Sequence, residues 1–517
     1  MNMSKRDQKT ATDSDASAEA AGLGLRGRIG FLLKDSILYG GAAAFMQGLS
    51  IITFPIMSRH FSVADYGIID FFGVLGSLVA VLLTFGLDSA IARFFYDTDD
   101  PEHRSQVISQ ALTINLLALL PIMGAMYLAS QAMTSFVPDS PDSNLLIKLT
   151  VLNAPFMVIT SQALNICKWS FARKRYLVLS VGGASLRVCV LVTLILVFDI
   201  GVTGIFWMNL GLSGTTALVG LVFIMPWLRV PKLGRLTRAI AWYALPLWLI
   251  SIMSALGPFI ERSITESLFG DVALGEYGAG AKIALLMSLP LFAFQMAWGP
   301  LSMSIHKKSD SDLTYSVILK LFTLVAIGMA LTLGALAPLL LRILAPEEYD
   351  AGAVVVLPLA FGMAMAGIQN IIGVGISIKK RSHLRLPAFL AGIGIGLPAI
   401  YFLGGAMGIL GVALGALLMK TTELLISSWI SVRIYPIDWP VARVTITCCA
   451  GLAMALLIGM GSEIGDLFWF CLVSVTAILI FGIAGYHVLL NAAERDSIMT
   501  KIRTLSPVTG IRKINKH

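Results

Sequence analysis

The chain has 517 residues, of which 57% are hydrophobic and 13% are charged, and its formal net charge is +8. Soluble domains carry about 25% charged residues, so this composition excludes an ordinary soluble fold and indicates a protein that lies mainly in a bilayer. The basic residues fall in short segments between apolar runs, which indicates membrane topology and argues against nucleic-acid binding.

Apolar stretches long enough to cross a bilayer occur about fourteen times, since a helical span needs about 20 apolar residues. A polar segment rich in Ser, Ala, Asp and Gly precedes them and predicts a disordered cytoplasmic tail over residues 1–33. Only a Gly-rich turn separates the eleventh and twelfth spans, so one re-entrant unit is an alternative there. The predicted spans are 35–58, 67–91, 106–130, 144–167, 177–198, 203–228, 239–267, 277–303, 313–341, 352–378, 384–403, 407–431, 441–461 and 467–490.

The loops between the predicted spans alternate in charge. One set is basic, as in residues 168–175 and the linker 229–238, whereas the alternate set is mainly acidic, as in Asp199 and residues 347–350. Loops rich in Lys and Arg stay on the cytoplasmic side of a membrane. The alternation therefore predicts that the linker and both termini are cytoplasmic.

Two landmarks recur along the chain at one spacing. Asp65-Tyr66-Gly67 returns 211 residues later as Glu276-Tyr277-Gly278, and the basic cluster at Lys168 returns 211 residues later at Lys379. A repeat of six spans gives both halves the same orientation, as in parallel-repeat transporters. The predicted fold is an all-α polytopic membrane protein with two pseudo-symmetric six-helix bundles. They cover 34–228 and 239–435, followed by two extra spans in 436–492 and a basic cytoplasmic tail, 493–517.

Charged residues at membrane depth are the candidate functional residues, because each costs several kcal/mol unless it faces water or a partner. The stretch from Glu261 to Lys282 is interpreted as a short outer loop with its flanking helix ends. Arg262 lies fifteen residues before Tyr277 and Arg59 only seven before Tyr66, so Arg262 is predicted to lie about 12 Å deeper. Neighbouring residues on a helix do not face each other, so we expect Arg262 to line a cavity. Glu261 alternatively neutralises a nearby cation.

Other charges lie at comparable depth. Arg187 lies near the middle of the fifth predicted span, and Lys420 lies similarly deep in the twelfth. Lys420 either binds substrate or forms a structural pair with Glu423, three residues on. Arg59 is interpreted as snorkelling to the interface, and Asp88 is expected near the cytoplasmic interface, paired with Arg93.

The excess of cations over acids predicts an anionic substrate, and a diphosphate suits the bidentate geometry of Arg. The predicted substrate-binding residues are Arg262, Lys282, Arg187, Lys420 and Arg59, and the predicted coupling or charge partners are Glu261, Glu423 and Asp88.

Motifs for catalysis, metals and cofactors are missing from the sequence. There is no HExxH and no GxSxG, and GEYGAGAK lacks the GK[ST] ending of a phosphate-binding loop. The five cysteines include no CxxC pair. The sequence therefore predicts no enzyme activity, no metal, no cofactor and no disulfide framework.

Four phrases in order carry a resemblance to a known family: FPIMSRHFSVADYGIIDFF, GLDSAIARFFYD, ERSITESLFGDVALGEYGAGAKIA and LAPEEYDAGAVVVLPLA. They resemble segments of the Wzx-type polysaccharide flippases, within the multidrug, oligosaccharidyl-lipid and polysaccharide exporter superfamily. The resemblance implies two six-helix bundles around a central cavity. It also implies flipping of undecaprenyl-diphosphate-linked oligosaccharide from the cytoplasmic to the periplasmic leaflet of a bacterial inner membrane, driven by an ion gradient.

The chain departs from that family at two places: Glu261 stands where many members have Asp, and the spans in 441–490 are additional. In the lipid II flippases of the superfamily, two such helices form a groove thought to hold the lipid tail. The implied partners are membrane lipid, the lipid-linked glycan of an O-antigen, exopolysaccharide or capsule pathway, and a polysaccharide polymerase with export proteins.

Two other functions are also compatible with the sequence. A cation-coupled multidrug exporter of the same superfamily would favour intramembrane carboxylates, but the first predicted span has only Asp35, at its edge. A membrane glycosyltransferase or polysaccharide polymerase usually needs a long outer loop, and every predicted outer loop is short.

Overall fold

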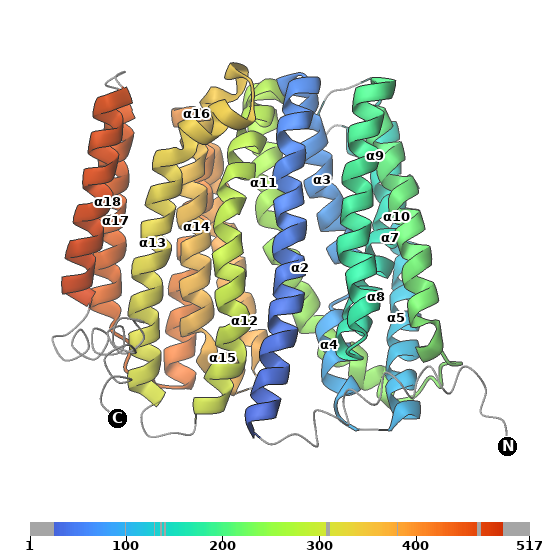
Figure 1. The fold of residues 1–517 in the computed structure, drawn as a ribbon. Helices are drawn as coiled ribbons and strands as arrows, with labels where there is room; N and C mark the ends of the chain where they lie inside the picture. Colours follow the sequence, from blue (N-terminus) through green and yellow to red (C-terminus); the bar gives the residue numbers. More distant parts are fainter. Residues whose placement is uncertain are drawn as a thin grey trace, which may run out of the picture.

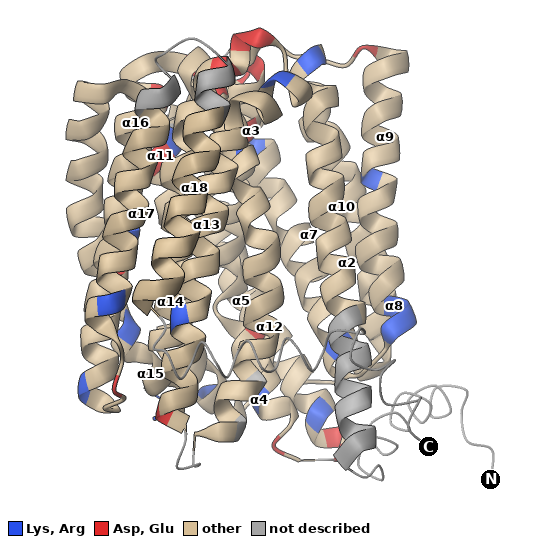
Figure 2. Cartoon of the chain, turned by 60° about the vertical axis from the view of Figure 1, so that its left-hand side comes forward, with Lys and Arg blue, Asp and Glu red and all other residues tan. Residues whose placement is uncertain are grey.

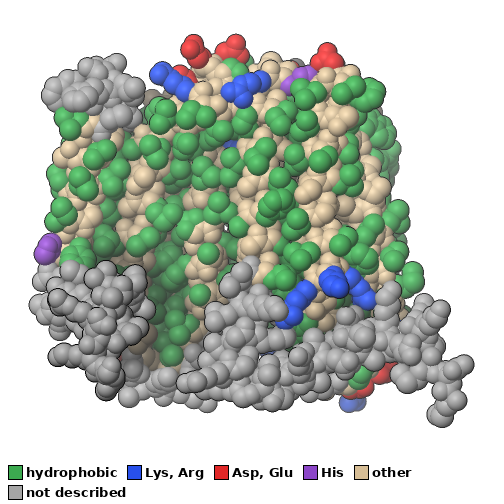
Figure 3. Space-filling view, viewed as in Figure 1, with side chains coloured by type: hydrophobic (Ala, Val, Ile, Leu, Met, Phe, Trp, Pro, Cys, Tyr) green, Lys and Arg blue, Asp and Glu red, His purple; other side chains and the backbone are tan. Residues whose placement is uncertain are grey.

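The computed structural model describes residues 25–98, 100–128, 130–134, 137–138, 141–306, 311–379, 381–462 and 467–489. Within these residues the chain forms helices and no strands, and the long helices run side by side between two ends of the molecule (Figure 1). On the face seen in Figure 3, apolar side chains are spread over the surface between the ends. This is the surface expected of a protein whose solvent is the bilayer.

Twelve helical segments of the described chain are long and apolar enough to cross a membrane. Two of them, Arg235–Met303 and Ser382–Ile434, have 69 and 53 residues, which is enough for two crossings each. Each is broken at a glycine with positive φ, Gly270 at 77° and Gly408 at 66°, a conformation that only glycine adopts readily. Counted in this way, the described chain has enough apolar helix for fourteen crossings, the number predicted.

The N-terminal half of the molecule runs from α2 to α10. Pairs of its helices, such as α7 with α10 and α3 with α7, pack along their length. Helix α4 lies outside the candidate spans. The elements are α2 (Leu25–His60), α3 (Val63–Thr84), α4 (Leu87–Phe95), α5 (Pro101–Leu128), α6 (Ser130–Met133), α7 (Ser143–Trp169), α8 (Arg173–Leu177), the π-helix η2 (Val178–Gly182), α9 (Gly183–Phe198), α10 (Val202–Ile224) and η3 (Met225–Trp227).

The C-terminal half of the molecule runs from α11 to α16, and two further helices pack on its α13. Phe481 and Ile458 of those two helices are buried in the core of this half. The elements are α11 (Arg235–Ala284), η4 (Leu285–Met287), α12 (Ser288–Ile305), α13 (Ser311–Leu344), η5 (Glu347–Gly352), α14 (Ala353–Ile372), α15 (Val374–Ile378), η6 (Ser382–Arg385), α16 (Leu386–Ile434), α17 (Val441–Ser462) and α18 (Leu467–Leu489).

The two ends of the molecule are named here by their charge (Figure 2). The acidic end carries Asp142, Asp199 and the segment η5, and the basic end carries α4, α8 and the linker 229–234. At the acidic end the halves are in close contact, because α3 packs against the part of α11 that follows Gly270. A Cβ atom on Gly67 would lie 2.6 Å from the Asp271 carbonyl oxygen, and one on Gly275 would overlap the Val63 carbonyl. Glycine at these two positions thus permits backbone-to-backbone packing between the halves.

Two predictions about segment ends need correction. Helix α2 begins at Leu25, so the last residues of the predicted disordered tail, 25–33, are helical. The predicted outer loop between the seventh and eighth spans is only a break at Gly270, with helix on both sides. Residues 1–24 and the predicted basic tail, 493–517, lie outside the described residues.

Candidate functional site

Arg262 lies at the centre of a buried ion-pair cluster that joins the two halves. It is on α11, eight residues before Gly270, and therefore about 12 Å below the acidic end. Its Nε atom lies 3.2 Å from Oδ2 of Asp70 on α3, and its NH1 atom lies 3.1 Å from Oε2 of Glu261. Arg262 is only 7% exposed, so two carboxylates compensate one buried cation.

Tyr277 completes this cluster from the far side of the Gly270 break. Its hydroxyl donates a hydrogen bond of 2.9 Å to Oε2 of Glu261, and the Arg262 guanidinium lies 5.1 Å from the centre of its ring. The side chain of Tyr277 is fully buried. The Glu-Tyr-Gly motif therefore contributes a hydroxyl that stabilises a buried carboxylate and a ring face that favours the cation.

The predicted separation of Arg262 from Glu261 is wrong. Consecutive helical side chains point in different directions, but these two are long and both bend toward the space beside Tyr277. Asp70, the partner from the other half, was not among the predicted site residues. The sequence nevertheless contained a signal for Asp70, because this residue is a carboxylate inside the apolar run of α3. Such residues usually have a functional or structural partner.

Lys282 is a second deep cation of this region. It lies on α11 twelve residues after Gly270, about 18 Å along the helix. It is within electrostatic range of Asp70 and Arg262. In the part of the chain that the structure describes, its ammonium group makes no hydrogen bond or ion pair.

Lys420 and Glu423 form a pair on α16, with 3.1 Å from Nζ to each carboxylate oxygen. Glu423 is almost fully buried, and its Cγ atom would lie 2.5 Å from a Cβ on Gly392. Lys420 also acts electrostatically on Glu261. The two clusters therefore belong to one network of buried charge.

Arg187 lies apart from this network, on α9 of the N-terminal half. Its guanidinium donates to Oδ1 of Asn209 at 2.9 Å and to Oγ of Ser213 at 3.1 Å, both on α10. These partners are neutral, and no carboxylate of the described chain forms an ion pair with it. Its positive charge is thus solvated by the protein without being neutralised.

Arg59 and Asp88 lie outside these clusters. Arg59 is exposed at the acidic end and donates to the Ile343 carbonyl at 3.1 Å. The predicted pair of Asp88 with Arg93 is wrong. The Arg93 guanidinium lies 4.7 Å from the centre of the Tyr243 ring, whereas Asp88 faces Asn165, Lys168 and Gln162 of α7.

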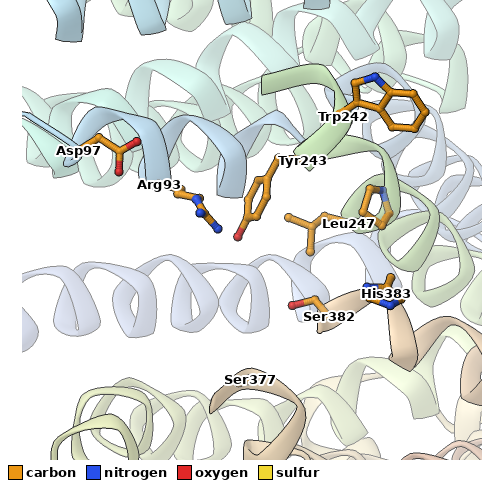
Figure 4. Close-up of a pocket in the computed structure, with 9 residues that line it drawn as sticks. Arg93, Asp97, Trp242, Tyr243, Leu247, Ser377, Ser382 and His383 are labelled. Atoms are coloured by element: carbon orange, nitrogen blue, oxygen red, sulfur yellow. The ribbon is translucent and has the colours of Figure 1, made fainter. Parts of the chain in front are cut away.

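A cavity of about 490 Å³ lies at the basic end, between the halves (Figure 4). The N-terminal half contributes Arg93 and Asp97, and the C-terminal half contributes the rest of the wall from α11, α15 and η6. This cavity lies at the opposite end of the molecule from the close contact between α3 and α11. The cavity is lined by Arg93, Asp97, Trp242, Tyr243, Pro246, Leu247, Ser377, Ser382 and His383.

The two helical halves, the buried ion pair between them and a cavity at one end define the class of protein: a multi-pass membrane protein built of two helical halves. Known structures share this fold. The lipid II flippase MurJ in an inward closed conformation aligns with a TM-score of 0.64 at 15% identity, covering 88% of this chain and 100% of MurJ. An inward-facing multidrug resistance MATE family transporter of the MOP superfamily gives 0.58 at 16% identity, covering 78% and 95%.

A MOP superfamily transporter from Pyrococcus furiosus also aligns, with a TM-score of 0.56 at 16% identity, covering 79% of this chain and 96% of that one. No curated protein sequence matches the chain. The family model described as "Polysaccharide biosynthesis protein" matches residues 32–306, more than half of the chain. The chain therefore belongs to this polysaccharide biosynthesis family, and its fold is that of the MOP superfamily transporters.

Proposed function

We propose that this protein is a flippase for undecaprenyl-diphosphate-linked oligosaccharide in a bacterial inner membrane. The basic end faces the cytoplasm, in keeping with the loop charges. The flipped glycan then serves a polymerase and export proteins of an O-antigen, exopolysaccharide or capsule pathway. Membership of the polysaccharide biosynthesis family supports this assignment, as does the similarity in fold to a lipid II flippase.

The observation that carries the proposal is the ammonium group of Lys282, which lies deep in the protein and makes no direct hydrogen bond or ion pair in the described chain. A lysine deep in a membrane protein costs several kcal/mol unless water or an anion meets it. Arg262 already has two carboxylates, so in this conformation Lys282 is the better phosphate ligand. Arg187 supplies a second unneutralised cation from the other half. A diphosphate would compensate such charges, whereas a cationic drug would add to them.

The ion pair between Asp70 and Arg262 suggests how binding is linked to movement. It joins α3 of one half to α11 of the other, so opening the acidic end must separate the two groups. A diphosphate that has reached Arg262 can replace Asp70 as its counter-ion. Such a ligand binds the open conformation better than the closed one, and only a difference of this kind can shift the balance between two states.

The experiment compares Lys282→Gln with Lys282→Arg in cells that lack other flippases for the same glycan. Losing a hydrogen bond to a charged group costs about 1.5–3 kcal/mol, so Lys282→Gln should slow glycan export by about 10- to 100-fold. Lys282→Arg should keep most of the activity. Lys174→Gln, at an exposed position of the basic end, is the matched control. Export at the normal rate by Lys282→Gln, with equal protein in the membrane, would contradict the proposal.

A further inference from the structure

Helix α4 places a carboxyl group against the apolar face of α7, where part of it has no partner. Oδ1 of Asp88 is inaccessible to solvent and accepts no hydrogen bond. Gln162 of α7 is only 1% exposed, and neither its Oε1 nor its Nε2 has a partner. Unpaired buried polar atoms are uncommon in native proteins and call for an explanation.

These unpaired atoms lie close to one another. Gln162 and Asn165 approach the Asp88 carboxyl group within hydrogen-bonding reach, although Gln162 lacks good geometry, and Lys168 acts on it electrostatically. Gln162 and Asn165 are three residues apart and share one face of α7. The surrounding contact between α4 and α7 is apolar, with Leu87, Ala90 and Ile91 packed near Ala163 and Ile166.

One proton accounts for all of the unpaired atoms. An ionised Asp88 can only accept hydrogen bonds, so Oε1 of Gln162 then has no donor, which costs about 1–3 kcal/mol. A protonated Asp88 donates its O–H to Oε1 while Nε2 donates to the other carboxyl oxygen. The acid and the amide then form a cyclic pair with two hydrogen bonds. The proton comes from the aqueous phase, and no other bond is made or broken.

We infer that Asp88 and Gln162 form a proton-binding site that fixes α4 against α7 when it is occupied. Arg93, which lines the cavity at the basic end, is on the same nine-residue helix. Occupancy of the site therefore sets the position of one cavity wall. The link to transport rests on the proposed function, whereas proton binding itself does not.

The charged groups around the site are few. The charged residue of α7 that acts on Asp88 is Lys168, and its positive charge favours the ionised acid. On α4 itself, Arg93 stacks on Tyr243 of α11, and from α5 Arg104 stacks on Phe95 at the end of α4. Burial raises the pKa of the Asp88 carboxyl group, and Asn165, Lys168 and Gln162 lower it by less.

Infrared spectroscopy of the purified full-length protein tests the site without any substrate. A buried protonated carboxyl group gives a C=O stretching band that appears as the pH falls. The band should be present in wild type and Asp97→Asn, whose carboxylate is exposed, and missing in Asp88→Asn. Gln162→Leu should move the band to higher frequency, because the acid loses its hydrogen-bonded partner. Identical titrations of wild type and Asp88→Asn would overturn the inference.

The unfolding temperature supplies a second, independent measurement. Since the pKa of Asp88 is raised by folding, its contribution to stability is present at low pH and is lost as the pH rises through the folded pKa. Asp88→Asn should therefore match wild type at low pH and exceed it at high pH. If Na⁺ stabilises wild type but not Asp88→Asn, and pH has no effect, the site binds a metal cation and the inference of a proton site is overturned. An Asp88-dependent band in a protein that flips no glycan would support the site and refute the proposed function.

Discussion

Removing Arg262 should destabilise the protein as well as stop transport, because it leaves two buried carboxylates facing each other. Asp70 and Glu261 lose their common counter-ion in Arg262→Ala, and Glu261 keeps only the hydroxyl of Tyr277. Breaking a buried pair by removing one partner costs about 3–5 kcal/mol. We expect the upper part of this range, since one cation serves two acids here.

The structure also predicts how related variants rank in stability. Asp70→Asn should lower the free energy of unfolding by less than Arg262→Ala does, because Arg262 then keeps Glu261 as its partner. The double variant Asp70→Asn with Arg262→Ala should be more stable than Arg262→Ala alone, because it leaves one buried carboxylate in place of two. Groups in direct contact are not additive, so the double variant should cost less than the sum of the singles.

The assay is the unfolding temperature of the purified protein in detergent, with membrane abundance measured in parallel. Arg342→Ala is the control. It breaks another Arg–Asp pair, with Asp350 at 3.1 Å, but the Arg342 side chain is 66% exposed. Exposed pairs contribute about 0–1 kcal/mol, so this change should be nearly neutral. The ion-pair argument is refuted if the unfolding temperature of Arg262→Ala is no lower than that of Arg342→Ala. It is also refuted if adding Asp70→Asn to Arg262→Ala restores no stability.

Two further predictions concern the architecture. Single cysteines at Asp199 and Arg235, in a chain without its native cysteines, should react with an impermeant reagent from opposite sides of the membrane; reaction of both in intact cells would contradict the orientation derived from loop charge. A chain ending after Pro436 should insert and keep part of its glycan export, because α17 and α18 pack mainly on each other and on α13 of the C-terminal half. Full export at normal abundance would remove any role of the pair in engaging lipid, and total loss at normal abundance would make it part of the transport machinery.

The sequence predicted the membrane class, the number of spans and the two-part architecture because these depend on apolar length and on a repeated order of segments. It also placed Lys420 within reach of Glu423, since residues three apart on a helix lie on one face. It could not supply Asp70 as the partner of Arg262. The two residues are 192 positions apart, and no helical periodicity connects them.

Side-chain pairing inferred from sequence spacing was wrong where tertiary packing had the larger effect. Helix geometry separates Glu261 from Arg262, yet both side chains bend toward the buried space beside Tyr277, because pairing there lowers the cost of burying each charge. Asp88 lies near Arg93 in sequence, but α4 turns one toward α7 and the other toward α11.

The sequence by itself determined how many helices cross the membrane and which charges lie at depth, because the bilayer imposes length and polarity on each segment separately. The tertiary structure alone decided which of those charges are neutralised. Arg262 is paired across the halves, while Lys282 and Arg187 have no carboxylate against them in the described chain. That distinction depends on which helices pack side by side, and the electrostatic energy of a buried charge is set by the neighbours that this packing brings within a few ångströms.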